Sequence, residues 1–196
     1  MQPKDSSIFA DVSDYFGIDN PAIAEKDYYV VQLLKLLASH YCQHHTMVFA
    51  GGTALAKADV NATGVFQVER AEVTCRDEHR YIEMPVRYPQ AFSKAPCLRP
   101  FIKLELIETD LLAGHNPMPI CSLHNEAMQQ EPEVPAFNTV PLISTQAEKV
   151  LSMLRRTASV KHDPERLDDE SLVRHIYDTY RLQQSTTFDL AELSGL

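Results

Sequence analysis

A pair of glycines between an apolar run and a helix constrains this chain more than any other stretch. The apolar run 47–50 contains β-branched and aromatic residues, which favours a strand, and Gly51 and Gly52 allow backbone angles that side chains forbid. Thr53 can cap the following helix, because its hydroxyl can accept from the free amides of the first turn. Such a corner gathers exposed amides where a phosphate can sit. Gly-Gly turns also follow strands for packing alone, so both interpretations stay open.

Length and composition indicate a globular protein with an ordinary core. The 196 residues are 44% hydrophobic and 23% charged, which suggests one domain or a core with a small appendage. No apolar run approaches the ~20 residues that span a bilayer, and the first residues lack the apolar core of a signal peptide. We therefore expect a cytoplasmic protein with no membrane partner. The formal charge of −9 disfavours non-specific binding to duplex DNA, because that affinity comes mainly from clustered Lys and Arg.

Cysteine and histidine positions give little support for a metal centre. Four scattered cysteines without a Cys-x-x-Cys pair favour reduced thiols over structural zinc or a disulfide framework: Cys42, Cys75, Cys97 and Cys121. The histidines of the stretch 40–45 lie at a predicted helix end, where their spacing does not place three ligands on one face. A histidine-based metal hydrolase is therefore the least supported of three functional hypotheses.

The amino-terminal half predicts one long helix. Asn20 and Pro21 have the chemistry of an N-cap and a first helical position, and apolar residues recur at helical spacing as far as about Tyr41. The charged stretch 25–27 lies in the first two turns, where we expect solvated side chains.

Three stretches have strand character: 65–74, 80–87 and 101–108. Pro85 indicates an edge strand or a bend in the second. In the third, alternate residues from Ile102 form an apolar face, while Lys103 and Glu105 share the opposite face. That parity suits either a solvated surface or a carboxylate aimed into a ligand cleft.

A loop-rich stretch, 111–143, separates this part from two helices. The first helix is expected at 145–157, with a capping box from Thr145 to Glu148, and the second at about 168–182. Apolar residues on both are expected to face inward: Val150, Leu151, Leu154, Leu172, Val173, Ile176, Tyr177 and Tyr180. We predict an α/β (α+β) core over 1–143 and a helical part over 144–196.

The order of these signals resembles a known family. It runs from Glu-Lys-Asp-Tyr-Tyr at 25–29 through Gly-Gly-Thr at 51–53, Lys-Leu-Glu at 103–105 and Glu-Lys at 148–149 to Tyr-Asp at 177–178. This set resembles the AbiEii/AbiGii family of nucleotidyltransferase toxins from bacterial abortive-infection and toxin-antitoxin systems. On motif order, the similarity covers roughly residues 22–58 and 78–183.

The resemblance implies a fold, an activity and site residues. The fold would be a reduced polymerase-β-like nucleotidyltransferase sheet, mixed in strand direction, with flanking helices. The activity would be Mg²⁺-dependent transfer of a nucleotide from a nucleoside triphosphate to an RNA, such as a tRNA, or a protein acceptor, and the partner an antitoxin. Residues matching the family's motifs would act as follows: Gly51, Gly52 and Thr53 hold phosphate, Glu105 assists metal binding, Lys149 neutralises phosphate charge, and Asp178 orients the acceptor or the lysine.

One element of the family pattern is missing. The family carries Asp-x-Asp on the strand after the glycine corner, where two carboxylates on one face hold Mg²⁺. The stretch 59–69 contains no Asp-x-Asp, and Asp59-Val60-Asn61 is its nearest imitation. Because nucleotidyl transfer depends on metal-assisted charge stabilisation, a catalytically inactive homologue that binds an antitoxin or another protein is the alternative hypothesis.

Overall fold

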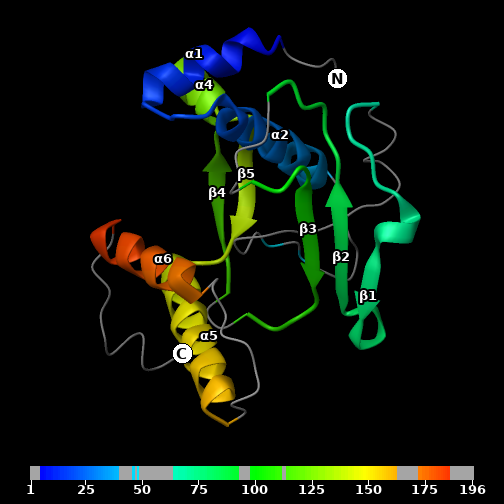
Figure 1. Cartoon of the computed structure of the whole chain (residues 1–196), viewed down its shortest axis with the longest axis vertical. Helices are drawn as coiled ribbons and strands as arrows, with labels where there is room; N and C mark the ends of the chain where they lie inside the picture. The colour runs from blue at the N-terminus through cyan, green and yellow to red at the C-terminus, as the bar shows by residue number, and fades with distance from the viewer. Residues whose placement is uncertain are drawn as a thin grey trace. The chain divides into compact units, whose positions relative to one another are not determined.

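The computed structural model describes residues 5–39, 46, 48, 64–92, 98–111, 114–162 and 172–185. Gly51, Gly52 and Thr53 and the histidine stretch 40–45 lie outside the described residues. The chain divides into two compact units, Met1–Thr109 with Pro117–Thr139 and Asp110–Asn116 with Val140–Leu196. The predicted boundary between residues 143 and 144 stays a prediction. Helices and strands are both present, so the α/β class is confirmed (Figure 1).

Two helices begin the first unit: α1 (Ser7–Phe16) and α2 (Pro21–Ala38). Asn20 caps α2 as predicted, because its side-chain oxygen accepts from the Ala22 N–H at 2.9 Å. The helix ends at Ala38, earlier than predicted, and the Ser39 N–H donates to the Leu36 carbonyl. On α1, Phe9 and Val12 are buried against α2, and Gly17 in the left-handed conformation ends the helix.

The charged start of α2 is a junction rather than a solvated surface. Glu25 is 2% exposed and accepts from the Ala91 N–H at 2.7 Å, while Asp27 accepts from the Leu123 N–H at 2.7 Å. Lys26 donates to the Arg99 carbonyl at 3.0 Å. The expectation of solvated side chains is wrong here, because backbone groups far away in the sequence satisfy them. Burial raises the pKa of both acids.

Three antiparallel strands form the main sheet, in the order β1 (Thr74–Arg76), β2 (Tyr81–Val86) and β3 (Ile102–Ile107). Two predicted strands are therefore confirmed. The strand expected over 65–74 is wrong: it contains an isolated bridge from Gln67 to Arg87, the 3₁₀ turn Arg70–Glu72 and only the first residue of β1. The turn brings Glu72 to Arg87, and its carboxylate accepts from the guanidinium at 2.7 Å.

Pro85 lies in the middle strand of the three, so the expectation of an edge strand is wrong, and the alternative of a bend stays a prediction. Its register explains how the sheet tolerates it. β1 pairs with β2 only from Tyr81 to Glu83, and Pro85 is opposite Lys103 on the β3 side. Among the described residues, the β1–β2 ladder does not extend beyond Glu83, and the next pairing on that side is the isolated bridge from Gln67 to Arg87, so the N–H that proline lacks is not needed at position 85.

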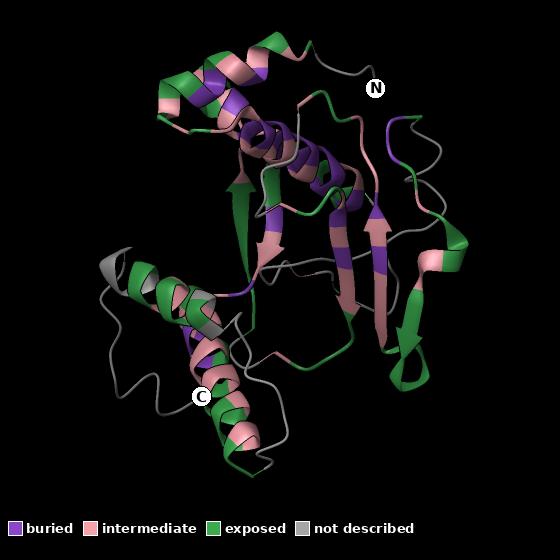
Figure 2. Cartoon of the chain, viewed as in Figure 1, coloured by how far each residue is buried: buried purple, intermediate pink, exposed green. Residues whose placement is uncertain are grey.

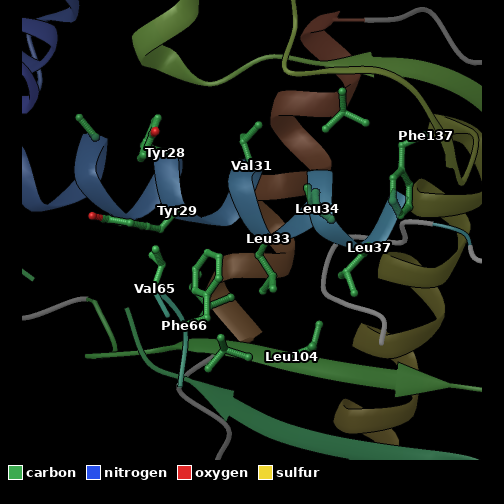
Figure 3. Close-up of a cluster of buried hydrophobic side chains, with 14 of the residues drawn as sticks. Tyr28, Tyr29, Val31, Leu33, Leu34, Leu37, Val65, Phe66, Leu104 and Phe137 are labelled. Atoms are coloured by element: carbon green, nitrogen blue, oxygen red, sulfur yellow. The ribbon is translucent and has the colours of Figure 1, made fainter. Parts of the chain in front are cut away.

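The core lies between α2 and the sheet. Leu33 of α2, Phe66 of the segment before β1 and Leu104 of β3 are at most 2% exposed, and Figure 3 shows their side chains close together. Leu34 and Leu37 extend this cluster toward Phe137 of β5 (Val134–Thr139). One helix therefore packs on side chains from two sheets, and close packing of this kind gives a domain its stability.

The remaining part of the first unit contains only short helices and strands, as predicted for the loop-rich stretch 111–143. β4 (Asn116–Ile120) and β5 form a two-stranded sheet, and α4 (Leu123–Ala127) lies between them in the sequence. Ser122 caps α4, and Glu133 accepts from both its N–H and its hydroxyl. Asp27 and Glu133 therefore tie this helix to α2 and to the approach to β5.

The second unit consists mainly of α5 (Leu142–His162) and α6 (Leu172–Ser185). Because α5 begins at Leu142, Thr145 lies inside the helix and the predicted capping box is wrong. The expected apolar inward face is also wrong for Leu151 and Leu154, at 42% and 61% exposed, and for four residues of α6 between 57% and 68% exposed: Val173, Ile176, Tyr177 and Tyr180. Figure 2 shows exposed positions along both helices. Ser144 and Gln146 of α5 are buried instead.

Candidate functional site

Lys149 of α5 and Asp178 of α6 form the pair that the family resemblance assigns to nucleotide handling. The Lys149 Nζ lies 2.6 Å from Asp178 Oδ2, across 29 residues of sequence. Both side chains are partly accessible, at 30% and 41% exposed. The structure thus brings these two predicted site residues together, and their site roles stay a prediction.

The pair is held by the way α6 packs on α5. Asp178 and Thr179 are half-buried, whereas Ile176, Tyr177 and Tyr180 are exposed. The polar side of α6 therefore faces α5, which turns Asp178 toward Lys149 and its apolar residues outward. Helical periodicity explains why the exposed residues lie together, because residues three or four apart share a face.

Sequence reasoning missed several polar side chains in these helices. Ser144 and Gln146 are at most 3% exposed, and the Ser144 Oγ, Gln146 Oε1 and Thr179 Oγ1 atoms have no hydrogen-bond partner in the described part of the chain. Buried polar atoms without partners are rare in folded proteins. Their signal in the sequence was weak, because serine, threonine and glutamine on a helix usually face solvent.

Glu105 occupies a different environment on the outer face of the main sheet. It lies directly opposite Glu83 in the β2–β3 register. The Lys103 ammonium bonds one oxygen of each carboxylate, at 2.7 Å from Glu105 and 3.0 Å from Glu83. The Tyr81 hydroxyl contacts the same two oxygens, at 2.6 Å and 2.8 Å. The polar-face parity predicted for Lys103 and Glu105 is confirmed.

These contacts set the protonation states of the four groups. The Lys103 ammonium and the Tyr81 hydroxyl lower the pKa of Glu83, and they lower the pKa of Glu105 despite the opposing effect of burial. The Lys103 pKa is raised because its bonds to both carboxylates outweigh its burial. The Tyr81 pKa is raised, chiefly by its bond to Glu105. Two carboxylates, one ammonium and one neutral phenol are therefore the stable combination at neutral pH.

Mg²⁺ does not fit this arrangement. The ion requires near-octahedral oxygen ligands at about 2.0–2.1 Å, and several ligands must be free of competing cations. Here the facing oxygens of Glu83 and Glu105 already bond an ammonium. Among the described residues, no group of three or more His, Cys, Asp or Glu side chains is placed to hold a metal ion.

Two other predictions concern the cysteines and membrane-spanning helices. Cys75 and Cys121 are free, as the scattered spacing predicted, while the other cysteines lie outside the described residues. Over the same part of the chain, no helix is both long and apolar enough to cross a bilayer.

Comparison with protein-family models decides the relationship. The model described as "Nucleotidyl transferase AbiEii toxin, Type IV TA system" matches residues 58–196, well over half of the chain. The chain belongs to the AbiEii family. Searches of curated proteins and of solved structures found no match.

The AbiEii match covers some of the predicted site residues and not others. Glu105, Lys149 and Asp178 lie within it, and Gly51, Gly52 and Thr53 precede it. The match also runs through the stretch 59–69, which contains no Asp-x-Asp pair. The Lys149–Asp178 pair and Glu105 therefore each have a described geometry inside the family match, and of the two only the pair is free of the network that occupies the Glu105 carboxylate.

Proposed function

We propose that this AbiEii-family chain acts as the toxin of a toxin-antitoxin pair by transferring a nucleotide from a nucleoside triphosphate to an RNA, such as a tRNA, or a protein acceptor. The observation that supports the proposal most is the Lys149–Asp178 contact at 2.6 Å within the family match. A cytoplasmic location and an antitoxin partner accompany this proposal.

Lys149 supplies the positive charge for the triphosphate. An ammonium neutralises charge on phosphate oxygens, and fixed charges of this kind stabilise the transition state of phosphoryl and nucleotidyl transfer. Asp178 holds the Lys149 ammonium at a defined place until phosphate oxygens replace or join the carboxylate. The partial exposure of both groups leaves room for that exchange.

The glycine corner supplies amide donors in this proposal. Gly51 and Gly52 would let a phosphate come close to the backbone amides, and Thr53 would begin the following helix. These residues lie outside the described part of the chain, so their role rests on the resemblance alone. The family chemistry uses Mg²⁺ with the triphosphate, and the described carboxylates around Glu105 do not fit that ion.

The test is transfer of label from triphosphates. Purified wild-type protein is incubated with each α-³²P-labelled nucleoside triphosphate, Mg²⁺, and either total cellular RNA or a protein extract. Lys149→Ala removes the proposed phosphate contact, and Lys161→Ala is the matched control because it removes an exposed lysine from the same helix. The proposal expects wild type and Lys161→Ala to label an acceptor and Lys149→Ala to fail. No labelling by wild type with any triphosphate would contradict it.

A second candidate function has a specific observation in its favour. Glu105, the carboxylate that the resemblance assigns to metal binding, is engaged by Lys103 and Tyr81, and the sequence lacks Asp-x-Asp. A chain without metal ligands would keep the scaffold and act by binding an antitoxin or another protein.

The two candidates differ in one direct experiment. Co-expression of the chain with the product of its neighbouring gene, followed by size-exclusion chromatography, detects a stable complex. A complex together with no label transfer supports the binding function. Label transfer that Lys149→Ala abolishes supports the transferase.

A further inference from the structure

The network on the outer face of β2 and β3 has the shape of a cation site. Antiparallel register places Glu83 and Glu105 directly opposite each other, where side chains on one face are about 4.5–5.5 Å apart at Cβ. Like charges in such a pair repel, so the sheet needs a positive charge between them. Lys103 provides it from the same face of β3, two residues before Glu105.

Two carboxylate oxygens, one ammonium nitrogen and one phenol oxygen form a ring of contacts on this face of the sheet. The Lys103 Nζ and the Tyr81 Oη each contact the same two carboxylate oxygens, Oε2 of Glu83 and Oε1 of Glu105. The ammonium has three hydrogens and bonds both oxygens, whereas the phenol has one hydrogen and bonds one oxygen at a time. The facing oxygens are therefore satisfied by groups of the protein itself.

A second positive charge covers the same corner. The Arg76 guanidinium carbon lies 5.1 Å from the centre of the Tyr81 ring, and its charge helps to lower the pKa of Glu83. The side chains of Lys103, Glu83 and Glu105 are 26%, 29% and 30% exposed, so solvent ions can reach this face. Accessibility is thus not what would keep a metal ion away.

We infer that the Lys103 ammonium is the resident cation of the Glu83–Glu105 carboxylate pair and that it excludes divalent metal ions from this face of the sheet. A divalent ion at the pair would stand within a few ångströms of the ammonium, and it would have to displace two charge-assisted hydrogen bonds. The inference does not depend on whether the chain transfers nucleotides, and its readout is independent of activity.

The experiment uses Mn²⁺ as a paramagnetic probe of the full chain. Mn²⁺ is titrated while the ring signals of Tyr81 are followed by NMR, with the exposed Tyr15 of α1 as the internal reference for non-specific broadening. Lys103→Met removes the ammonium and keeps an aliphatic stem, and Lys35→Met is the matched control because it removes an exposed lysine from α2.

The inference expects wild type and Lys35→Met to show no broadening of Tyr81 beyond that of Tyr15. In Lys103→Met, removal of the nearby positive charge strengthens Mn²⁺-dependent broadening of Tyr81 by about tenfold or more. Selective, saturable broadening of Tyr81 in wild type would overturn the inference, and this arm needs no variant to fold. A folded Lys103→Met protein that binds no Mn²⁺ at Tyr81 would also overturn it.

Discussion

Lys149 and Asp178 are joined by an ion pair of 2.6 Å, and apolar side chains of both helices, α5 and α6, are exposed. Ordinary amphipathic packing would bury the apolar stripe and expose the charges. The opposite arrangement in these helices brings a lysine and an aspartate together within the AbiEii match.

The stability carried by the Lys149–Asp178 pair should be small. Because the two side chains are 30% and 41% exposed, solvent screens the pair, and we expect a coupling free energy below about 1 kcal/mol in a double-mutant cycle. Urea unfolding of wild type, Lys149→Ala, Asp178→Asn and the double variant measures it. A coupling of several kcal/mol would make the pair a structural element instead.

Glu25 should couple the fold to pH. Its folded pKa is raised above its ordinary value of 4.5, chiefly by burial, so its contribution to the free energy of unfolding is fully present below pH 4.5 and lost as pH rises through the folded pKa. Glu25→Gln keeps an acceptor for the Ala91 N–H without the charge. The difference in unfolding free energy between Glu25→Gln and wild type should therefore shift in favour of the variant as pH rises from 4 to 7.

Glu25→Ala separates the charge from the hydrogen bond. It removes the side-chain acceptor of the Ala91 N–H, and the loss of such a hydrogen bond costs about 0.5–1.5 kcal/mol. Equal stability of the Ala and Gln variants across this pH range would show that the bond to Ala91 contributes nothing.

Lys103→Met should destabilise the sheet in a pH-dependent way. The lowered pKa values of Glu83 and Glu105 contribute stability above their ordinary value of 4.5, and this contribution is lost as pH falls through the folded values. Without Lys103 the facing carboxylates repel, and we expect a loss of about 1 kcal/mol at pH 7. That loss should shrink as pH falls below 4.5 and the two carboxylates become protonated. A pH-independent loss in chemical denaturation would point to packing of the lysine stem.

The two faces of β3 should respond differently to truncation. Leu104 is 1% exposed and Ile107 is 61% exposed. Leu104→Ala should cost about 2–5 kcal/mol because it leaves a cavity beneath α2, whereas Ile107→Ala should stay within about 0.5 kcal/mol of wild type. Thermal unfolding of the two variants compares them, and similar losses would contradict the assignment of faces.

Local patterns predicted the parts of the fold that depend on neighbouring residues. The Asn20 cap and the alternation of Ile102, Lys103, Leu104 and Glu105 arise from interactions within one turn or one strand, and both are confirmed. The predicted starts and ends of α5 and α6 differ from the observed ones by several residues, because tertiary contacts also determine where a helix ends.

Long-range contacts account for the failures. The burial of Glu25 depends on an amide 66 residues away, which no local pattern reveals. The exposed apolar stripe of α6 contradicts the predicted inward face. Periodicity identifies the two faces of a helix, but it does not say which face meets α5. The Lys149–Asp178 pair was found through the family resemblance, since each residue alone is an ordinary surface charge.

The most direct test of the central claim measures nucleotide transfer in the Lys149 and Asp178 cycle. Single-turnover label transfer is compared among wild type, Lys149→Ala, Asp178→Asn and the double variant, with Lys161→Ala as control. If the pair acts as one unit on the triphosphate, Lys149→Ala and the double variant lose activity to the same extent, by about a hundredfold or more, and Lys161→Ala retains it. Wild-type rates in Lys149→Ala, or losses in the two single variants that multiply in the double variant, would contradict the account.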